Sequence, residues 1–287
     1  MSIRHKSLCF ATLAYGFQFR VHAKILAQDL MEWHPEVQFI VVTDHPEYFS
    51  ALPNVKAVKY SPSGIRHCYH DKRQVIRESI SLHSTCIYLD ADCRILAPVN
   101  YDELCQEGVF FTAMYGENLN QKLAGEIGAG VNVHSPNGAV RRKKILHNIS
   151  LHENVAFENI TFINEVFFVV NSNFGDVGSF LDTWDYCADY TTARLFEFGE
   201  GASIGIALEK MGTVPHLFQR CPPWLFKDVL KDTKTKTAEQ IEVFQRLLAL
   251  RRALECEAWP RKSKVIKAIG IFSAAMRFYI NYLNRRR

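Results

Sequence analysis

Two acidic residues, Asp90 and Asp92, stand one residue apart directly after the apolar run Ile87–Leu89. Two carboxylates at such a chain reversal can converge on one hard divalent cation. Mn²⁺ or Mg²⁺ held there would bridge the two phosphates of a nucleotide diphosphate and stabilise the charge that develops on it as a leaving group. Asp-x-Asp also occurs as an exposed, solvated pair, but the apolar residues on both sides make charge costly here unless it is coordinated.

The run Tyr88 to Asp92 reads Tyr-Leu-Asp-Ala-Asp. It resembles the signature of the GT-A glycosyltransferases, especially the glycogenin-like and bacterial lipooligosaccharide galactosyltransferase-like group, and the resemblance extends loosely over residues 7 to 225. It implies a metal-dependent enzyme that transfers a hexose from a nucleotide diphosphate sugar, expected to be a UDP-hexose, with retention of configuration. In that group the first acid contacts the donor ribose and the metal, which assigns Asp90, and the second chelates the metal, which assigns Asp92.

The same resemblance nominates residues that bind the nucleotide. The first strand of such enzymes cradles the base and ribose, which points to Thr12 and Tyr15, and Asp44 follows the second strand. Basic residues that open the helix before the acidic pair contact the donor in the family, so we expect this role for Lys72 or Arg73. The structural alternatives are turn residues, a tyrosine at the edge of the core and a solvated helix face.

Three further residues are candidates for sugar binding or catalysis. Family members carry an Asn-x-Gly-Val type strand near the donor sugar; this chain has Asn164-Glu165-Val166, which departs from that pattern by lacking the glycine, although Asn164 could still bond a hydroxyl. Glu200 matches an acidic residue that begins the following helix in many relatives. Its alternative role is to complement the helix dipole.

His216 is the candidate third metal ligand, because the family places a histidine ahead of a Lys-Pro-Trp sequence near the end of the core. Here His216 precedes Pro222-Pro223-Trp224, with shorter spacing and without the lysine. The alternative is an ordinary packed histidine. A second polar cluster, His67, Cys68, His70 and Asp71, fits no common zinc spacing. We expect it to form a loop near the donor site, with no second metal.

The surrounding pattern predicts an α/β fold. Apolar strands are expected over residues 7–14, 37–43, 55–60, 86–89, 109–114 and 166–170, and helical spacing is seen around Leu26–Trp33 and over residues 72–83, 177–190 and 202–211. Asp71 is expected to cap the helix at 72, and the glycine-rich stretch from Gly125 to Gly138 is expected to be a loop. Such alternation predicts a mostly parallel, Rossmann-like sheet of GT-A type flanked by helices, whose ligands bind at the carboxyl ends of the strands.

The chain divides by composition at about residue 225. Residues 1–225 are expected to form the catalytic domain, and residues 226–287 a helical extension with an amphipathic helix near 238–256 and a basic tail. Of the net charge of +4, residues 261–287 contribute eight positive charges and no acid, so residues 1–260 carry −4. This distribution disfavours nucleic acid as a partner of the domain.

In the tail, apolar and aromatic residues at helical spacing alternate with Lys and Arg, a pattern that suits an anionic membrane interface. The alternative is docking on the catalytic domain or on a second subunit. Eight scattered cysteines without a disulfide or zinc pattern and a first apolar stretch that reads as a strand rather than a signal peptide predict a cytoplasmic protein, peripheral on the inner face of the membrane. A glycan, a lipid-linked saccharide or a protein is the expected acceptor.

Two other functions fit parts of the pattern. A sugar-1-phosphate nucleotidyltransferase also combines an α/β sheet with a metal, but residues 14–18 lack a glycine-rich, basic phosphate loop. A non-catalytic protein that binds sugar nucleotides or another protein could use the same scaffold. The intact acidic pair argues against this second alternative.

Overall fold

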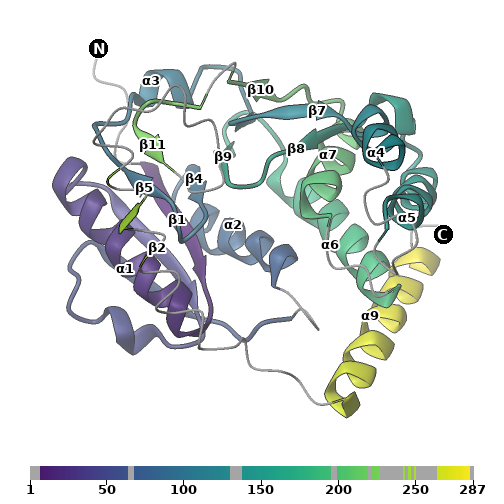
Figure 1. Ribbon diagram of the computed structural model, residues 1–287, viewed down its shortest axis with the longest axis horizontal. Coiled ribbons are helices and arrows are strands. Elements are labelled where there is room, and N and C mark those ends of the chain that lie inside the picture. Colours follow the sequence, from purple (N-terminus) through teal and green to yellow (C-terminus); the bar gives the residue numbers. More distant parts are fainter. Residues whose placement is uncertain are drawn as a thin grey trace.

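The computed structural model describes residues 7–63, 68–129, 138–194, 199–218, 221–226, 242, 245, 246, 249 and 264–284. Its centre is a seven-stranded sheet (Figure 1). The strands are β1 (Leu8–Ala14), β2 (Gln38–Thr43), β3 (Val55–Lys59), β4 (Thr85–Leu89), β6 (Phe111–Ala113), β9 (Phe167–Asn171) and β10 (His216–Leu217). Their order is β10-β6-β9-β4-β1-β2-β3. All neighbours are parallel except β9, which is antiparallel to both β4 and β6.

The helices are α1 (Gly16–Trp33), α2 (Lys72–Ile80), α3 (Tyr101–Leu104), α4 (Leu119–Gly128), α5 (Ala139–His152), α6 (Val177–Ala193), α7 (Glu200–Lys210) and α9 (Lys264–Asn284). Short 3₁₀ turns span Pro46–Phe49, Tyr69–Asp71 and Phe157–Asn159. Two antiparallel ladders complete the structure: β5 (Arg94–Ile95) with β11 (Leu225–Phe226), and β7 (Gly116–Asn118) with β8 (Thr161–Ile163). None of the described helices is long and apolar enough to cross a membrane.

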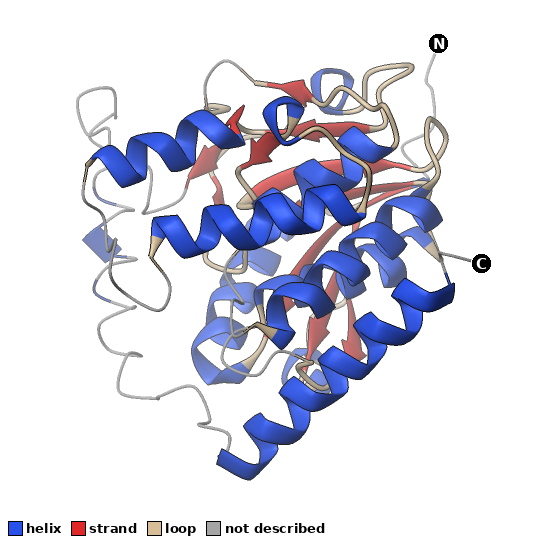
Figure 2. Cartoon of the chain, turned by 90° about the vertical axis from the view of Figure 1, so that its right-hand side faces the viewer, coloured by secondary structure: helices blue, strands red, loops and turns tan. Residues whose placement is uncertain are grey.

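The sheet is buried on both faces because successive residues of its strands point to opposite sides. On β1, Phe10 faces one core together with Leu26 and Leu30 of α1. Its neighbour Ala11 faces the other core, where Val75 of α2 and Trp184 of α6 lie. Helices therefore flank both faces (Figures 1 and 2). The predicted α/β class, the mostly parallel sheet and the C-terminal helix are confirmed.

Helix α7 lies directly on the backbone of β8. A Cβ atom added to Gly201 would lie 2.1 Å from the carbonyl oxygen of Ile163, and one added to Gly205 would lie 2.0 Å from that of Thr161. No side chain fits at either position, and the two glycines are one helical turn apart on the same face. This close approach fixes the start of α7, including Glu200, against the segment that leads into β9.

Helix α9 docks on α6 along one face. Ala274 is fully buried, the guanidinium of Arg277 pairs with the carboxylate of Asp189 at 2.7 Å, and the ring of Phe278 lies 4.8 Å from that of Tyr186. The opposite face carries exposed apolar side chains: Val265, Ile266, Ile269, Phe272, Met276, Tyr279, Ile280 and Leu283. Figure 2 shows this helix along the outside of the molecule.

Several expected details differ. Helix α2 ends at Ile80 rather than at residue 83, and Asp71 does not cap it with its side chain. The Asp71 carboxylate instead accepts a hydrogen bond from the Ser63 backbone at 3.0 Å. Gly125 and Gly128 belong to α4, so the expectation of a loop from Gly125 onward is wrong for these residues.

Other expectations lie outside the described residues. His67 and residues 130–137 are not described, nor is most of the predicted helix at 238–256, although its four described residues are helical. The proposed boundary at residue 225 stays a prediction.

Candidate active site

The ends of four neighbouring strands bring the predicted residues to one edge of the sheet. β1, β2 and β4 are parallel, so Tyr15, Asp44 and Asp90, which follow them, stand at the same edge. Because β9 runs the other way, this edge also receives the residues that precede it. The backbone N–H of Asp90 donates to the carbonyl of Val166 at 2.9 Å. This contact brings Asp90 close to Glu165, the residue before Val166, from a distant part of the chain.

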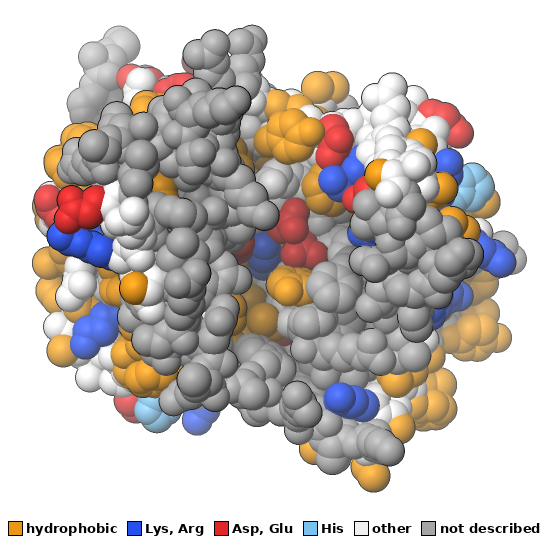
Figure 3. All heavy atoms as spheres, viewed as in Figure 1, with side chains coloured by type: hydrophobic (Ala, Val, Ile, Leu, Met, Phe, Trp, Pro, Cys, Tyr) orange, Lys and Arg blue, Asp and Glu red, His pale blue; other side chains and the backbone are white. Residues whose placement is uncertain are grey.

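A cavity of about 290 Å³ opens at this edge. Six of the predicted residues line it: Tyr15, Lys72, Asp90, Asp92, Glu165 and Glu200. Its other walls are Leu13, Gln18, Phe19, His22, Cys68, Tyr69, Tyr88, Ala91 and Val166. In the space-filling view, acidic and basic side chains lie beside each other in the hollowed centre of the face shown (Figure 3).

Lys72 is the cation of this cavity, and its side chain is only 5% exposed. Its ammonium group lies 3.0 Å from Oδ1 of Asp90 and 3.9 Å from Oε1 of Glu200, and it donates to the carbonyl of Glu165 at 3.1 Å. It also lies 5.4 Å from the centre of the Tyr88 ring. A buried ammonium needs such a set of acceptors to stay charged. Lys72 thus joins the three acidic segments of the site.

The two glutamates of the cavity influence each other. Burial and the neighbouring Glu200 carboxylate raise the pKa of Glu165 to about 8, while Lys72 opposes the shift. This shift favours the protonated carboxyl, which can donate a hydrogen bond as well as accept one. Glu200 opens α7, and its carboxylate accepts a hydrogen bond from the backbone of Gly199 at 3.2 Å. Glu200 thus also complements the dipole at the start of α7, which is the alternative role that the sequence suggested for it.

Tyr88 orients the first acid of the pair. Its hydroxyl donates to Oδ1 of Asp90 at 3.1 Å, and its ring stacks on Phe168 at 4.7 Å. Burial, followed by the charge of Asp90, raises the pKa of Tyr88 well above its ordinary value, so the phenol keeps its proton. Asp90 is held from two sides, by an ammonium and by a phenol.

Three predicted nucleotide-binding residues lie outside the cavity lining. Thr12 is fully buried, and its hydroxyl donates to the carbonyl of Leu89 at 2.7 Å. Asp44 pairs with Arg20 at 2.7 Å and accepts from the backbone of Gly16, which helps to shape the start of α1. Arg73, the neighbour of Lys72 in α2, pairs with Asp185 of α6 at 2.7 Å.

Asn164 and His216 also have structural partners. The side chain of Asn164 accepts a hydrogen bond from the backbone of Val166 at 3.3 Å, which shapes the turn into β9. His216 lies on β10, near the strand starts rather than at the edge that carries Asp90, and its Nε2 lies 3.2 Å from the side-chain nitrogen of Gln106. The structure does not bring His216 together with Asp90 and Asp92.

Sequence reasoning missed a helical face that lines the cavity. Gln18, Phe19 and His22 follow soon after Tyr15, and their helical spacing places the three on one side of α1. That spacing was present in the sequence and could have identified them. Tyr69 also lines the cavity and was missed, although it lies between Cys68 and His70 of the predicted loop cluster. Cys68 lines the cavity as well, and burial raises the pKa of its thiol to about 12.

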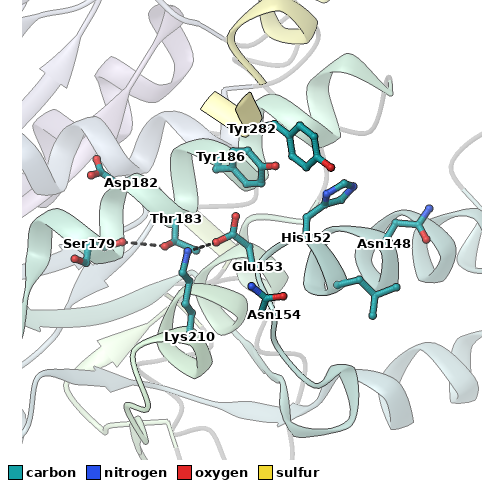
Figure 4. Close-up of a pocket in the computed structure, with 11 residues that line it drawn as sticks. Asn148, His152, Glu153, Asn154, Ser179, Asp182, Thr183, Tyr186, Lys210 and Tyr282 are labelled. Carbon is teal, nitrogen blue, oxygen red and sulfur yellow. Dashed lines mark hydrogen bonds and ion pairs between the residues drawn. The ribbon is translucent and has the colours of Figure 1, made fainter. Parts of the chain in front are cut away.

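A larger cavity, of about 740 Å³, lies between α5, α6 and α9 (Figure 4). Its residues include Asn148, His152, Tyr186 and Tyr282, and the figure shows the carboxylate of Glu153 directed at Lys210, with which it pairs. It contains none of the predicted site residues. The size of a cavity therefore does not by itself identify the candidate active site of this protein.

Comparison with known proteins finds solved structures that are distantly similar to this chain. No protein-family model and no curated protein matches the sequence. Among solved structures, the bifunctional glycosyltransferase WbbM in its apo form aligns with a TM-score of 0.43 and 8% identity, over 88% of this chain and 45% of that one, so this chain spans less than half of WbbM. An active-site mutant of LgtC aligns with a TM-score of 0.44 and 12% identity, over 84% of this chain and 95% of that one.

Proposed function

We propose that this protein is a metal-dependent glycosyltransferase of GT-A type that transfers a hexose from a nucleotide diphosphate sugar. The observation that carries the proposal is the position of Asp90 and Asp92, which end a buried parallel strand and line one cavity with Lys72. Ligands of open α/β sheets bind at this edge. The five-residue resemblance around Asp90 supports a UDP-hexose as the donor and retention of configuration.

The acidic pair suits Mg²⁺ or Mn²⁺. Both side chains offer hard oxygen ligands to the same cavity. Within the described parts of the chain, no group of three His, Cys, Asp or Glu residues is placed to hold a metal. Mg²⁺ is commonly held by one or two carboxylates together with substrate phosphates. Asp90 and Asp92 therefore fit a site that the diphosphate of the donor completes, without His216.

The transfer itself needs charge stabilisation more than covalent help. The bond between the anomeric carbon and the phosphate oxygen breaks, and its electron pair leaves with the nucleoside diphosphate. The acceptor hydroxyl forms the new bond to the anomeric carbon, and its proton passes to an oxygen of the departing diphosphate. When bound, the cation supplies Lewis-acid stabilisation of the leaving diphosphate. Lys72 adds a fixed positive charge beside Asp90, in a site where little water weakens it.

Glu165 and Glu200 are the candidates for holding the donor hexose. Both line the cavity next to Lys72, and a carboxyl group bonds sugar hydroxyls in either protonation state. Tyr15 and the α1 face of Gln18, Phe19 and His22 lie at the β1 side, where the nucleoside would be held. Asn164 acts through the turn it shapes before β9, as a positioning residue.

The test is hydrolysis of a panel of nucleotide sugars with and without Mn²⁺, comparing the native chain with Asp90→Asn and Asp92→Asn. Asp102→Asn is the matched control, because Asp102 is an acidic residue on α3 that lines a different cavity. We expect metal-dependent release of nucleoside diphosphate from one donor, lost in both site variants and kept in the control. Pyrophosphate release from a nucleoside triphosphate would instead indicate a nucleotidyltransferase. Absence of hydrolysis for every nucleotide sugar tested would contradict the proposal.

We further propose that the outer face of α9 holds the protein on the inner face of an anionic cytoplasmic membrane, where the acceptor is a glycan or a lipid-linked saccharide. The eight exposed apolar side chains of α9 form one face of the helix, which is more than scattered surface residues would give, and the tail is strongly basic. Ile269→Glu with Phe272→Glu should abolish binding to phosphatidylglycerol vesicles. Val214→Glu, at an apolar residue 88% exposed outside α9, is the control. Equal vesicle binding of both variants would refute the membrane role.

A further inference from the structure

A second cavity, of about 310 Å³, adjoins the proposed donor site. The two cavities share Tyr69, Glu165 and Glu200, so these side chains form a common wall between them. Gly201 adds to this wall, because a Cβ atom there would lie 2.9 Å from Oε2 of Glu165. The side chain of Glu165 thus lies on the first turn of α7, between the two spaces.

We infer that this second cavity binds the acceptor and that the acceptor is a neutral saccharide. The inference rests on the proposed function, since an acceptor hydroxyl has to reach the anomeric carbon of a donor held beside Glu165 and Glu200. A cavity that shares its wall with the donor site provides that approach. The reacting centres are then both within reach of the same two carboxyl groups.

The walls of the second cavity combine two kinds of surface. One part is apolar, formed by Leu119, Leu123, Leu146 and Phe162. The other part is polar and charged, formed by Lys122, Glu126 and Arg142 together with the shared glutamates. A sugar ring presents C–H groups on its faces and hydroxyls at its rim, so it can contact both surfaces at once, as ligands in mixed pockets generally do.

The charges of this cavity are already balanced. The ammonium group of Lys122 pairs with Glu117 at 2.8 Å and lies 3.8 Å from Glu126, and the guanidinium of Arg142 also pairs with Glu126. The Lys122 ammonium lies 4.6 Å from the centre of the Phe162 ring as well. Both cations of the cavity therefore already have an acidic partner, and the shared glutamates add no positive charge. The cavity has no excess positive charge for a phosphate or carboxylate, which favours a neutral ligand.

Arg142 is the basic residue that separates the second cavity from the donor site in an experiment. It lines the second cavity and not the donor cavity, and one of its terminal nitrogens pairs with Glu126. Its Nε is buried and has no hydrogen-bond partner in the described part of the chain, so the protein contacts do not satisfy the whole guanidinium. A change of Arg142 therefore reports on the second cavity rather than on the donor site.

The experiment measures saccharide binding directly on the full chain, by saturation-transfer NMR and calorimetry, with cellobiose, maltose and lactose and their aldobiouronic acids as probes. The native chain is compared with Arg142→Gln and with Lys144→Gln, a matched loss of charge at an exposed position of the same helix outside the cavity. Nucleoside diphosphate binding with Mn²⁺ is measured in parallel. Leu123→Trp, which fills the apolar part, is a second variant with thermal unfolding as its folding check.

We expect at least one neutral disaccharide to bind more tightly than its acidic counterpart. Arg142→Gln should weaken that binding about tenfold or more, as for loss of a hydrogen bond to a charged group, without changing nucleotide binding. Lys144→Gln should change neither. Preference for the acids, or equal saccharide binding in Arg142→Gln and in folded Leu123→Trp, overturns the inference. Failure of the proposed function is separate: it appears as no donor hydrolysis and no metal-dependent nucleotide binding in the native chain.

Discussion

The ammonium of Lys72 lies 3.0 Å from Oδ1 of Asp90, and this contact joins the start of α2 to the end of β4 inside the proposed donor site. Lys72 and Arg73 were equal candidates in the sequence, and the structure separates them. Lys72 lines the cavity, whereas Arg73 pairs with Asp185 on the side of α6. The two neighbouring basic residues therefore have different roles: Lys72 lies in the proposed donor site, and Arg73 joins α2 to α6.

We expect Lys72→Gln to lower donor turnover by about 10²- to 10³-fold, as for loss of one preorganised charge-stabilising group. Arg73→Gln should leave the turnover number and the donor KM unchanged and lower only the midpoint of thermal unfolding. Steady-state kinetics and thermal unfolding of the two variants test this pair. A larger kinetic effect of Arg73→Gln than of Lys72→Gln would reverse the assignment.

Thr12→Val should affect stability and leave ligand binding intact. The Thr12 hydroxyl is fully buried and donates to Leu89 at 2.7 Å, so it braces β1 against β4. Replacement with valine keeps the shape and leaves one buried acceptor without this donor, at a cost of about 1–3 kcal/mol in the free energy of unfolding. Chemical denaturation measures that cost. A rise in nucleotide Kd with unchanged stability would instead support the direct contact implied by the family resemblance.

Gly205→Ala should destabilise the protein by about 1–3 kcal/mol or more, because the new methyl group would lie 2.0 Å from a backbone oxygen of β8. Gly125→Ala is the control: it is also inside a helix, and nothing lies within 4 Å of its added Cβ. We expect Gly125→Ala to stabilise by about 0.5–1 kcal/mol through helix propensity. Opposite shifts in the unfolding midpoint are the expected result, and equal shifts would show that α7 can move off β8.

His70 should make stability fall in acid. Burial, aided by Arg73 and Lys72, lowers the pKa of His70 to about 3 from its ordinary 6.5, and its Nδ1 accepts a hydrogen bond from Trp184 at 3.1 Å. The unfolded chain takes up a proton below pH 6.5 and the folded chain does not until about 3. The contribution of His70 is therefore present above 6.5 and is lost across that window, by up to about 1.4 kcal/mol per pH unit.

The His70→Gln variant isolates this contribution, because glutamine does not titrate and its side-chain oxygen can accept the same hydrogen bond from Trp184. Urea unfolding at several pH values between 4 and 7 should give a smaller dependence on pH for the variant, by about one proton. Identical slopes for the two proteins would show that His70 is protonated in the folded state.

The sequence predicted most of the architecture because its signals are local. Alternation of apolar strands with helical spacing located β1, β2, β4 and β9, and the apolar run before Asp90 placed the acidic pair at a strand end. The α4 helix was missed because Gly125 and Gly128 suggested a loop. Helix formation around them is decided instead by the packing of Leu119 and Leu123 in a further apolar cluster, which they share with residues of α5 and α6. Local propensity was overridden there by tertiary contacts.

The site was predicted in part for the same reason. Lys72, Asp90, Asp92, Glu165 and Glu200 lie in order along the chain, but only the antiparallel direction of β9 places Glu165 beside Asp90. Nothing in the residues around β9 states its direction, because hydrophobic alternation is the same for parallel and antiparallel strands. The partners of Thr12, Asp44 and Arg73 are likewise long-range contacts, which one sequence does not reveal.

The place of β9 in the sheet also has a consequence for synthesis of the chain. β6 and β10 reach the rest of the sheet only through β9, although β6 precedes it in the sequence. Until about residue 171 has left the ribosome, β4 presents an unpaired edge and β6 lacks its sheet partner. Exposed edges of this kind favour association with other chains. The nascent protein is therefore most exposed to aggregation after β4 has formed and before β9 is added to the sheet.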